Sequence, residues 1–174
     1  MRFLLRLKHW QLFFLTWGTP IAIDIYSFSN PGLLIKLFPL IMTVFSITLL
    51  GWIWAISTEL SKLTPKEDQL NINRFKLIFS VPIIYIMGIN LFLLFPDSLK
   101  FLETILFSVA LIPIHIISLF GILYGCRFAG RAIKTIELGR IATDIESRRE
   151  YGQIAVSFIG IWTLQPKLNK IVAH

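Results

Sequence analysis

Long apolar runs, separated by short polar breaks, dominate the chain. Each run holds about 19–24 residues, enough to cross about 30 Å of hydrocarbon as a helix that rises about 1.5 Å per residue. The four runs cover about residues 10–28, 33–56, 77–95 and 102–125. The breaks contain Pro, Gly, Asn and Asp and lie at residues 29–32, 64–68 and 96–98. Because backbone polar groups in lipid must be satisfied within their own segment, the pattern predicts four transmembrane helices.

Composition also indicates a membrane protein. Of the 174 residues, 55% are hydrophobic and 16% are charged, whereas soluble domains average about 45–50% apolar and about 25% charged residues. The single cysteine, Cys126, excludes an internal disulfide and a cysteine-based metal cluster. We therefore expect an all-α integral membrane protein, with a four-helix transmembrane bundle over residues 1–126 and a cytoplasmic or interfacial helical region over residues 127–174.

The positive charges fall on one side of this topology. Of the 17 Lys and Arg residues, all but Lys36 and Lys100 lie in the N-terminal stretch, the second break with its flanks, or the region after the fourth run. Basic residues accumulate on the cytoplasmic side of membrane proteins, so both termini are expected in the cytoplasm of a multi-pass inner-membrane protein. The isoelectric point of about 9.8 is then a mark of topology, and nucleic-acid binding is not expected.

The first apolar run has two interpretations. Its basic start and apolar body are also typical of a cleaved signal peptide. No cleavage site of small residues follows it, and its removal would place one basic flank on the wrong side. We therefore expect an uncleaved first span.

Two features predict helical structure after the fourth run. Residues 127–140 continue its helical periodicity into the cytoplasm. Thr143 and Glu146 have the spacing of a capping box, in which two side chains satisfy free backbone N–H groups at a helix start. From there the pattern predicts one helix that runs to Gln165 and is stopped by Pro166.

The sequence does not decide how deeply that last helix enters the membrane. Its apolar part, residues 154–164, holds about eleven residues, which is too few to span a bilayer. A full crossing would also carry Lys167 and Lys170 to the outer side. We expect a short interfacial or re-entrant C-terminal helix, and a fifth span is the alternative.

A stripe of small residues ends the fourth run. Gly121, Gly125 and Ala129 recur every four residues, and such a stripe lets two helices approach closely in lipid. The stripe could serve packing within the chain, or it could form the face of a homo-oligomer or of a partner interface.

Three basic residues follow at helical spacing. Arg127, Arg131 and Lys134 are separated by four and three residues, so they share one helix face. One interpretation is contact with the anionic headgroups of the lipid bilayer, worth about 1 kcal/mol for each basic residue. The other interpretation is a solvated face that stops membrane insertion.

Three polar residues interrupt the apolar runs. His115 lies near the middle of the fourth run, Asp24 near the outer end of the first and Asn90 near the outer end of the third. Ionisable residues at such depth are costly and commonly functional, so the three could line a polar cavity open to the outside. In the alternative interpretation they are structural contacts, and His115 is satisfied by one hydrogen bond to a neighbouring helix.

Sequence motifs of enzymes are missing. The chain contains neither H-E-x-x-H nor G-x-S-x-G nor a glycine-rich phosphate loop. The three histidines, His9, His115 and His174, are predicted at different depths, so no metal and no other cofactor is expected. The main hypothesis is an accessory or scaffold protein that binds a membrane partner. The alternative is a small transporter or channel subunit with a polar cavity around His115, and an enzyme is the least favoured class.

Four sequence blocks carry a resemblance. They are KHWQLFFLTWGTP at residues 8–20, PIHIISLF at 113–120, KTIELGR at 134–140 and LQPKLNKI at 164–171. In these blocks the chain resembles a family of small, uncharacterised multi-pass proteins from Bacteroidota. Residues 154–164 depart from the resembling sequences, whose corresponding segment is longer and richer in Phe, Trp and Pro.

The resemblance implies a Gram-negative inner-membrane location and a set of pattern residues. The set consists of Trp10, Gln11, His115, Glu137, Gln165, Pro166 and Asn169. Apart from His115, these residues are predicted on the cytoplasmic side, where they could dock the C-terminal helix beneath the bundle or receive a partner.

Overall fold

The computed structural model describes residues 2–28, 31–64, 70–94 and 105–173. Over these residues the chain is helical and contains no strand, which confirms the all-α class. The elements in chain order are α1 (Arg2–Arg6), α2 (His9–Phe13), the π-helix η1 (Phe14–Gly18), α3 (Thr19–Ser27), α4 (Pro31–Ser61), α5 (Ile72–Leu94), α6 (Ile105–Leu138), α7 (Arg148–Ala155) and α8 (Ser157–Ala173). Of the predicted breaks at 29–32, 64–68 and 96–98, residues 29–30, 65–68 and 96–98 lie outside the described residues, and α4 already begins at Pro31.

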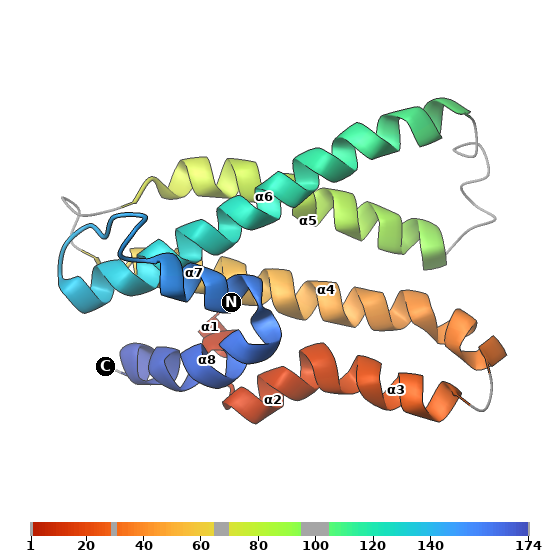
Figure 1. The fold of residues 1–174 in the computed structure, drawn as a ribbon, viewed down its shortest axis with the longest axis horizontal. Helices are drawn as coiled ribbons and strands as arrows, with labels where there is room; N and C mark the ends of the chain where they lie inside the picture. The colour runs from red at the N-terminus through yellow and green to blue at the C-terminus, as the bar shows by residue number, and fades with distance from the viewer. Residues whose placement is uncertain (1, 29–30, 65–69, 95–104, 174) are drawn as a thin grey trace.

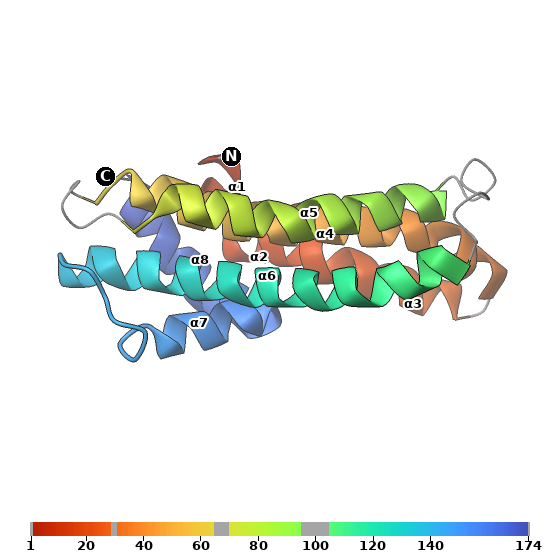
Figure 2. The ribbon, with the colours of Figure 1, turned by 90° about the horizontal axis from the view of Figure 1, so that it is seen from above.

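The long helices α4, α5 and α6 extend along the longest axis of the molecule (Figure 1). Helices η1 and α3 pack along α4, whereas α7 packs against α6 and α8 packs against α7, α2 and α1. Both chain ends lie in the half of the molecule that holds α7 and α8, as two perpendicular views agree (Figures 1 and 2). The N-terminal and C-terminal helices therefore assemble around the same part of the long helices.

Three of the described helices are long and apolar enough to cross a membrane. The candidate spans are Lys36–Ser61 of α4, Ile72–Leu94 of α5 and Ala110–Leu138 of α6. They overlap the second, third and fourth predicted spans and are compatible with a membrane location. The first predicted span is helical through residue 27, but it is divided among α2, η1 and α3.

Pro20 explains why the first apolar run is not one regular α-helix. A proline inside a helix has no N–H to donate, and its ring displaces the carbonyl four residues earlier. Just before Pro20 the backbone widens into η1, in which the Thr19 N–H bonds to the carbonyl of Phe14, five residues back. The Thr19 hydroxyl donates to the same carbonyl at 2.9 Å. The helix thus widens locally and does not end.

The predicted helical continuation after the fourth apolar run is confirmed as far as Leu138. Helix α6 runs without a break from Ile105 to Leu138. It ends before Gly139, whose φ of 64° is the left-handed conformation that commonly terminates a helix. One helix therefore connects a candidate span with the layer formed by α7 and α8.

The prediction of one C-terminal helix that runs to Gln165 is wrong. Residues 144–147 form a turn, α7 begins at Arg148, and the chain reverses at Val156. The reversal brings the two backbones into contact at Gly160 of α8. The space there is so small that a Cβ atom at this position would collide with the Gln153 carbonyl of α7. The chain therefore forms a helical hairpin, in which α8 packs on α7 where a single helix would have continued straight.

Pro166 does not stop α8, which continues to Ala173. A proline removes one backbone hydrogen bond and strains the preceding turn. The neighbouring side chains of Leu164 and Leu168 are buried in the core, and their packing offsets that cost. Tertiary contact therefore overrides the local stop signal.

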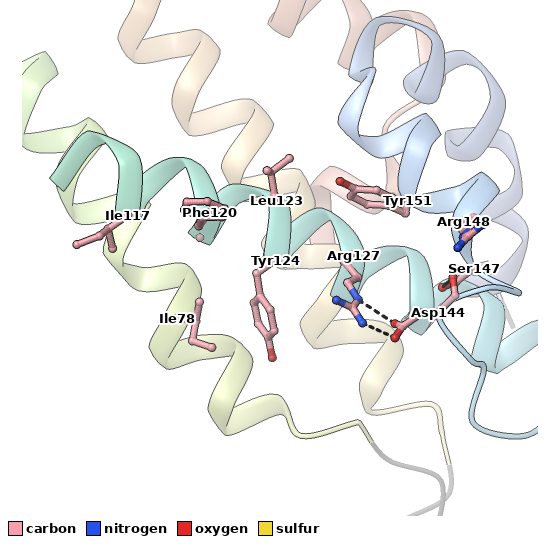
Figure 3. Close-up of a pocket in the computed structure, with 11 residues that line it drawn as sticks. Ile78, Ile117, Phe120, Leu123, Tyr124, Arg127, Asp144, Ser147, Arg148 and Tyr151 are labelled. Atoms are coloured by element: carbon pink, nitrogen blue, oxygen red, sulfur yellow. Dashed lines mark hydrogen bonds and ion pairs between the residues drawn. The ribbon is translucent and has the colours of Figure 1, made fainter. Parts of the chain in front are cut away.

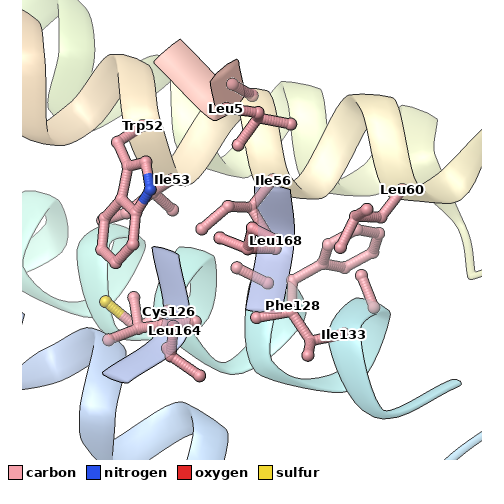
Figure 4. Close-up of a cluster of buried hydrophobic side chains, with 14 of the residues drawn as sticks. Leu5, Trp52, Ile53, Ile56, Leu60, Cys126, Phe128, Ile133, Leu164 and Leu168 are labelled. Atoms are coloured by element: carbon pink, nitrogen blue, oxygen red, sulfur yellow. The ribbon is translucent and has the colours of Figure 1, made fainter. Parts of the chain in front are cut away.

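A buried apolar cluster joins the two predicted regions of the chain (Figure 4). Leu5 of α1 and Trp52 of α4 belong to it, together with Phe128 of α6 and Leu168 of α8. Residues from both sides of the predicted boundary at 126 are thus packed in a single core, with α8 seated against α1 and α4.

Candidate functional site

The side-chain amide of Gln165 occupies a buried polar cluster between α8, α1 and α4. Its Nε2 donates to the backbone carbonyls of Leu4 and Leu7, each at 2.9 Å. Its Oε1 accepts a 2.8 Å hydrogen bond from the indole Nε1 of Trp52. Asn169, one turn later on α8, donates from Nδ2 to the Leu7 carbonyl at 3.1 Å. We term Trp52, Gln165 and Asn169 the amide clasp.

The amide clasp meets a requirement of the short N-terminal helix. The last carbonyls of any helix have no partner inside it, and α1 ends at Arg6 before the chain turns into α2. Gln165 and Asn169 supply donors at this turn. Gln11 of α2 accepts the Lys8 backbone N–H at 2.9 Å, which satisfies the start of the next helix. The arrangement attaches the N-terminal segment to α8 and presents no acid, base or nucleophile to a substrate.

Four charged side chains connect α6, α7 and α8. Lys167 Nζ lies 2.5 Å from Glu137 Oε1 and 3.4 Å from Glu150 Oε1. Lys134 Nζ lies 3.2 Å from Glu137 Oε2 and 3.9 Å from Glu150 Oε1. We term these four residues the charge network, in which two lysines balance two glutamates.

Glu150 is the most buried member of the charge network. Its side chain is 5% exposed, and its Oε2 atom has no hydrogen-bond donor in the part of the chain that the structure describes. A buried carboxylate persists only where opposite charges lie close to it. Lys134 and Lys167 supply those charges, so the network holds α7 between α6 and α8.

The remaining basic residues of the predicted headgroup face contact the connection from α6 to α7. Arg127 forms a bidentate ion pair with Asp144 (Figure 3). Arg131 Nε donates to the Ala142 carbonyl at 3.1 Å and lies 3.6 Å from Asp144 Oδ1. The hydrogen bond from Arg127 lowers the pKa of the Asp144 carboxyl below its usual value. Arg127, Arg131 and Lys134 are therefore all engaged with carboxylates of the chain itself.

The predicted capping box is present, although the helix begins later than expected. The Thr143 N–H donates to Glu146 Oε2 at 2.8 Å, and the Glu146 N–H donates to Thr143 Oγ1 at 3.4 Å. Arg140 pairs with the same carboxylate at 2.5 Å. The hydrogen bonds from Arg140 and Thr143 lower the pKa of Glu146 to about 2. The box thus stabilises the turn that precedes α7.

The three polar residues of the apolar runs have separate surroundings. Asn90 is buried, and its Nδ2 lies 3.5 Å from the Ser46 hydroxyl on α4. His115 is exposed on α6, and its Nδ1 lies 3.0 Å from the Tyr85 hydroxyl on α5. Asp24 is exposed on α3. Over the described ranges no hydrogen bond joins any two of Asp24, Asn90 and His115.

Two of the small residues of α6, Gly121 and Gly125, face α5. A Cβ atom at Gly121 would lie 2.8 Å from Pro82 Cδ, and one at Gly125 would collide with the ring of Phe79. Ala129, one turn further on, is fully buried. Gly121 and Gly125 therefore serve packing within the chain, the first of the two interpretations of the stripe.

Other residues of the site carry no distinctive sequence signal. In the sequence Trp52 is one of several aromatic residues in an apolar run, and Glu150 is one of several charged residues in a polar segment. Gly130 lies where α7 crosses α6, because a Cβ atom there would lie 2.7 Å from the Tyr151 backbone nitrogen. Trp10, which the resemblance marks, is 53% exposed on α2 and takes no part in the clasp.

The site offers no ligand set for a metal, since no three His, Cys, Asp or Glu side chains gather suitably among the residues with described positions. Comparisons with protein-family models, with curated proteins and with solved structures gave no match to this chain. The resemblance to the Bacteroidota family therefore stays a prediction.

Proposed function

We propose that this chain is a multi-pass inner-membrane protein that acts as an accessory or scaffold subunit and binds a membrane partner through the exposed face of α5 and α6. Residues 10–28 form a fourth span beside the three candidate spans, and both termini lie in the cytoplasm. The one-sided distribution of positive charge supports this topology. So does the position of both chain ends in one half of the molecule (Figure 1).

The observation that carries the proposal is the environment of His115. Its Nδ1 is paired with the Tyr85 hydroxyl, whereas its Nε2 has no hydrogen-bond partner within the described residues. The surrounding face is apolar and open, with Ile84 71% and Ile112 64% exposed. An unsatisfied imidazole nitrogen in hydrocarbon is costly. A partner helix can satisfy it with one polar side chain.

An apolar groove runs beside this polar pair. It lies between α5 and α6, has a volume of about 700 Å³, and is lined in part by Tyr85, Gly88 and Ile114. A Cβ atom at Gly88 would meet nothing within 4 Å, so the backbone of another helix can approach α5 closely at this point. These features suit a transmembrane helix of a partner protein better than a polar substrate.

The transport alternative requires polar residues that face one route. Asn90 bonds toward α4 and His115 toward α5, and Asp24 is exposed on α3. Three residues with three different environments do not favour a shared path, so we place transport behind partner binding.

The proposal also places the turn between α7 and α8 in the cytoplasmic leaflet. Phe158 packs against Phe13, with ring centroids 5.1 Å apart, and the Trp17 indole donates to the Ser157 hydroxyl at 3.3 Å. Phe13 and Trp17 belong to the first turns of the proposed first span. Val156 at the turn is 53% exposed. The hairpin would thus enter the leaflet and return, as an interfacial or re-entrant segment does.

Site-specific photo-crosslinking in intact cells tests partner binding. We expect a photoreactive residue at Ile84 to yield one discrete adduct with a different membrane protein, weakened by Tyr85→Phe and by His115→Phe. The same photoreactive residue at Ile47, which is 53% exposed on α4, is the matched control and should yield no such adduct. An adduct formed only with a second copy of this chain, or no protein adduct at Ile84, would contradict the proposal.

A further inference from the structure

A groove with an apolar end and a basic end lies where α5, α6 and the start of α7 meet (Figure 3). Its volume is about 770 Å³. Ile78 of α5 and Ile117 and Phe120 of α6 line the apolar end, and Arg127 and Arg148 line the basic end. Ten residues of α6 separate Ile117 from Arg127, a rise of about 15 Å. We term this feature the interfacial groove.

The basic end of the interfacial groove carries excess positive charge. Asp144 accepts the bidentate pair from Arg127 and lies 3.6 Å from Arg131 Nε. The guanidinium of Arg148 has neither an ion-pair partner nor a hydrogen-bond partner over the residues that the structure describes. Two arginines, Arg127 and Arg148, therefore line the groove together with one carboxylate, Asp144, and Arg131 lies beside the same carboxylate. Asp144 holds Arg127 in place, and Arg148 keeps all its donors available for an anion.

We propose that the interfacial groove binds an anionic phospholipid of the cytoplasmic leaflet. The guanidinium of Arg148 holds the phosphate, Arg127 contributes its positive charge from the opposite wall, and the first part of an acyl chain lies along Ile117 and Phe120. Guanidinium groups suit this task because their planar array of N–H donors matches phosphate oxygens. The inference goes beyond partner binding and rests only on the proposed membrane orientation.

The apolar end argues for a lipid over a soluble phosphate ester. Phe120 is 66% exposed and Ile117 is 56% exposed, and both belong to the candidate span Ala110–Leu138. A soluble phosphate ester would gain nothing from these side chains. A hydrocarbon chain directly below a phosphate is the chemistry of a glycerophospholipid at the membrane surface.

Native mass spectrometry of the full chain, titrated with phosphatidylglycerol or with zwitterionic phosphatidylethanolamine, tests the inference. We expect phosphatidylglycerol to bind more tightly, and its affinity to fall about fivefold in Arg148→Gln, the factor equivalent to about 1 kcal/mol for one basic residue at a membrane surface. Arg149→Gln is the matched control, because Arg149 is the next residue, is also exposed, and lies outside the groove. Its affinity should equal that of the wild type.

Two further arms separate the alternatives. Phe120→Ser should weaken phosphatidylglycerol binding, and glycerol 1-phosphate should fail to compete with the lipid at equal concentration. Effective competition by glycerol 1-phosphate would identify a soluble phosphate-ester site and overturn the inference. Equal losses of phosphatidylglycerol affinity in Arg148→Gln and Arg149→Gln would also overturn it, because the lipid would then be attracted by the overall positive charge of the surface and not by a defined site. The melting temperature of each variant checks that the fold is intact.

Discussion

Trp52 of α4 donates a 2.8 Å hydrogen bond to Gln165 of α8, across 113 residues of sequence. Both side chains are fully buried. The same glutamine amide also binds backbone carbonyls at the N-terminal turn. A single neutral side chain thus joins the two ends of the chain to a candidate span, which makes the amide clasp the clearest target for mutation.

Gln165→Leu is expected to lower the free energy of unfolding by roughly 2–4 kcal/mol. Leucine retains much of the volume but leaves the Trp52 N–H without an acceptor and removes a donor from the Leu4 carbonyl, at about 1–2 kcal/mol for each group. The Leu7 carbonyl keeps its hydrogen bond from Asn169. Trp52→Phe, which removes one of these bonds, should cost less, about 1–2 kcal/mol. Reversible unfolding in detergent measures both. If Gln165→Leu lowered the free energy of unfolding less than Trp52→Phe does, the central role of the Gln165 amide would be contradicted.

Lys167→Met is expected to destabilise the hairpin by roughly 1–3 kcal/mol, because it leaves buried Glu150 with one lysine and beside Glu137. Lys170→Met, at an exposed position of the same helix, is the control and should change stability little. Adding Glu150→Gln to Lys167→Met should recover part of the loss, since the buried charge is then removed. If the double variant instead lost the sum of the stabilities lost by the two single variants, the charge network would not be the cause of the destabilisation.

Two glycines of the facing helices are expected to respond in opposite directions. Gly125→Ala should destabilise the chain by about 1–3 kcal/mol, because the new methyl group meets the Phe79 ring. Gly88→Ala has open space around it and should be neutral or stabilise the helix by up to about 1 kcal/mol. Thermal unfolding of both variants in detergent gives the comparison. Equal changes in stability in Gly125→Ala and Gly88→Ala would contradict the close approach of α6 to α5.

The turn before α7 should weaken in acid. The pKa of Glu146 is about 2 in the folded chain, well below its ordinary value of 4.5, because Arg140 and Thr143 bond to the carboxylate. A lowered pKa means that the pairing contributes fully above about pH 4.5 and is lost as the pH falls toward 2. Asp144, whose pKa is also lowered, acts in the same direction.

Carbon-detected NMR of labelled carboxylates measures this effect. Arg140→Gln should raise the pKa of Glu146 toward 4.5, and Arg149→Gln, whose guanidinium lies outside this pair, should leave it unchanged. A pKa near 4.5 for Glu146 in the wild type would show that the Arg140 pairing is absent in solution.

The residues marked by the resemblance illustrate what a sequence can and cannot predict. Gln11, Gln165 and Asn169 all lie at the turn between α1 and α2, and Glu137 belongs to the charge network. Their expected location on the cytoplasmic side stays a prediction. Their bonding partners could not be predicted, because a hydrogen bond between residues more than 100 positions apart leaves no trace in local periodicity.

The helical class, the three long candidate spans and the extension of α6 past the apolar run could all be predicted from the sequence alone. These features depend on apolar run length and helical period, which are local properties of the chain. Three other features became visible only in the folded chain: the C-terminal segment forms a hairpin, Pro166 lies within a helix, and Gly121 and Gly125 face α5. Each of those outcomes follows from contacts between distant segments, where packing and buried hydrogen bonds outweigh local preference.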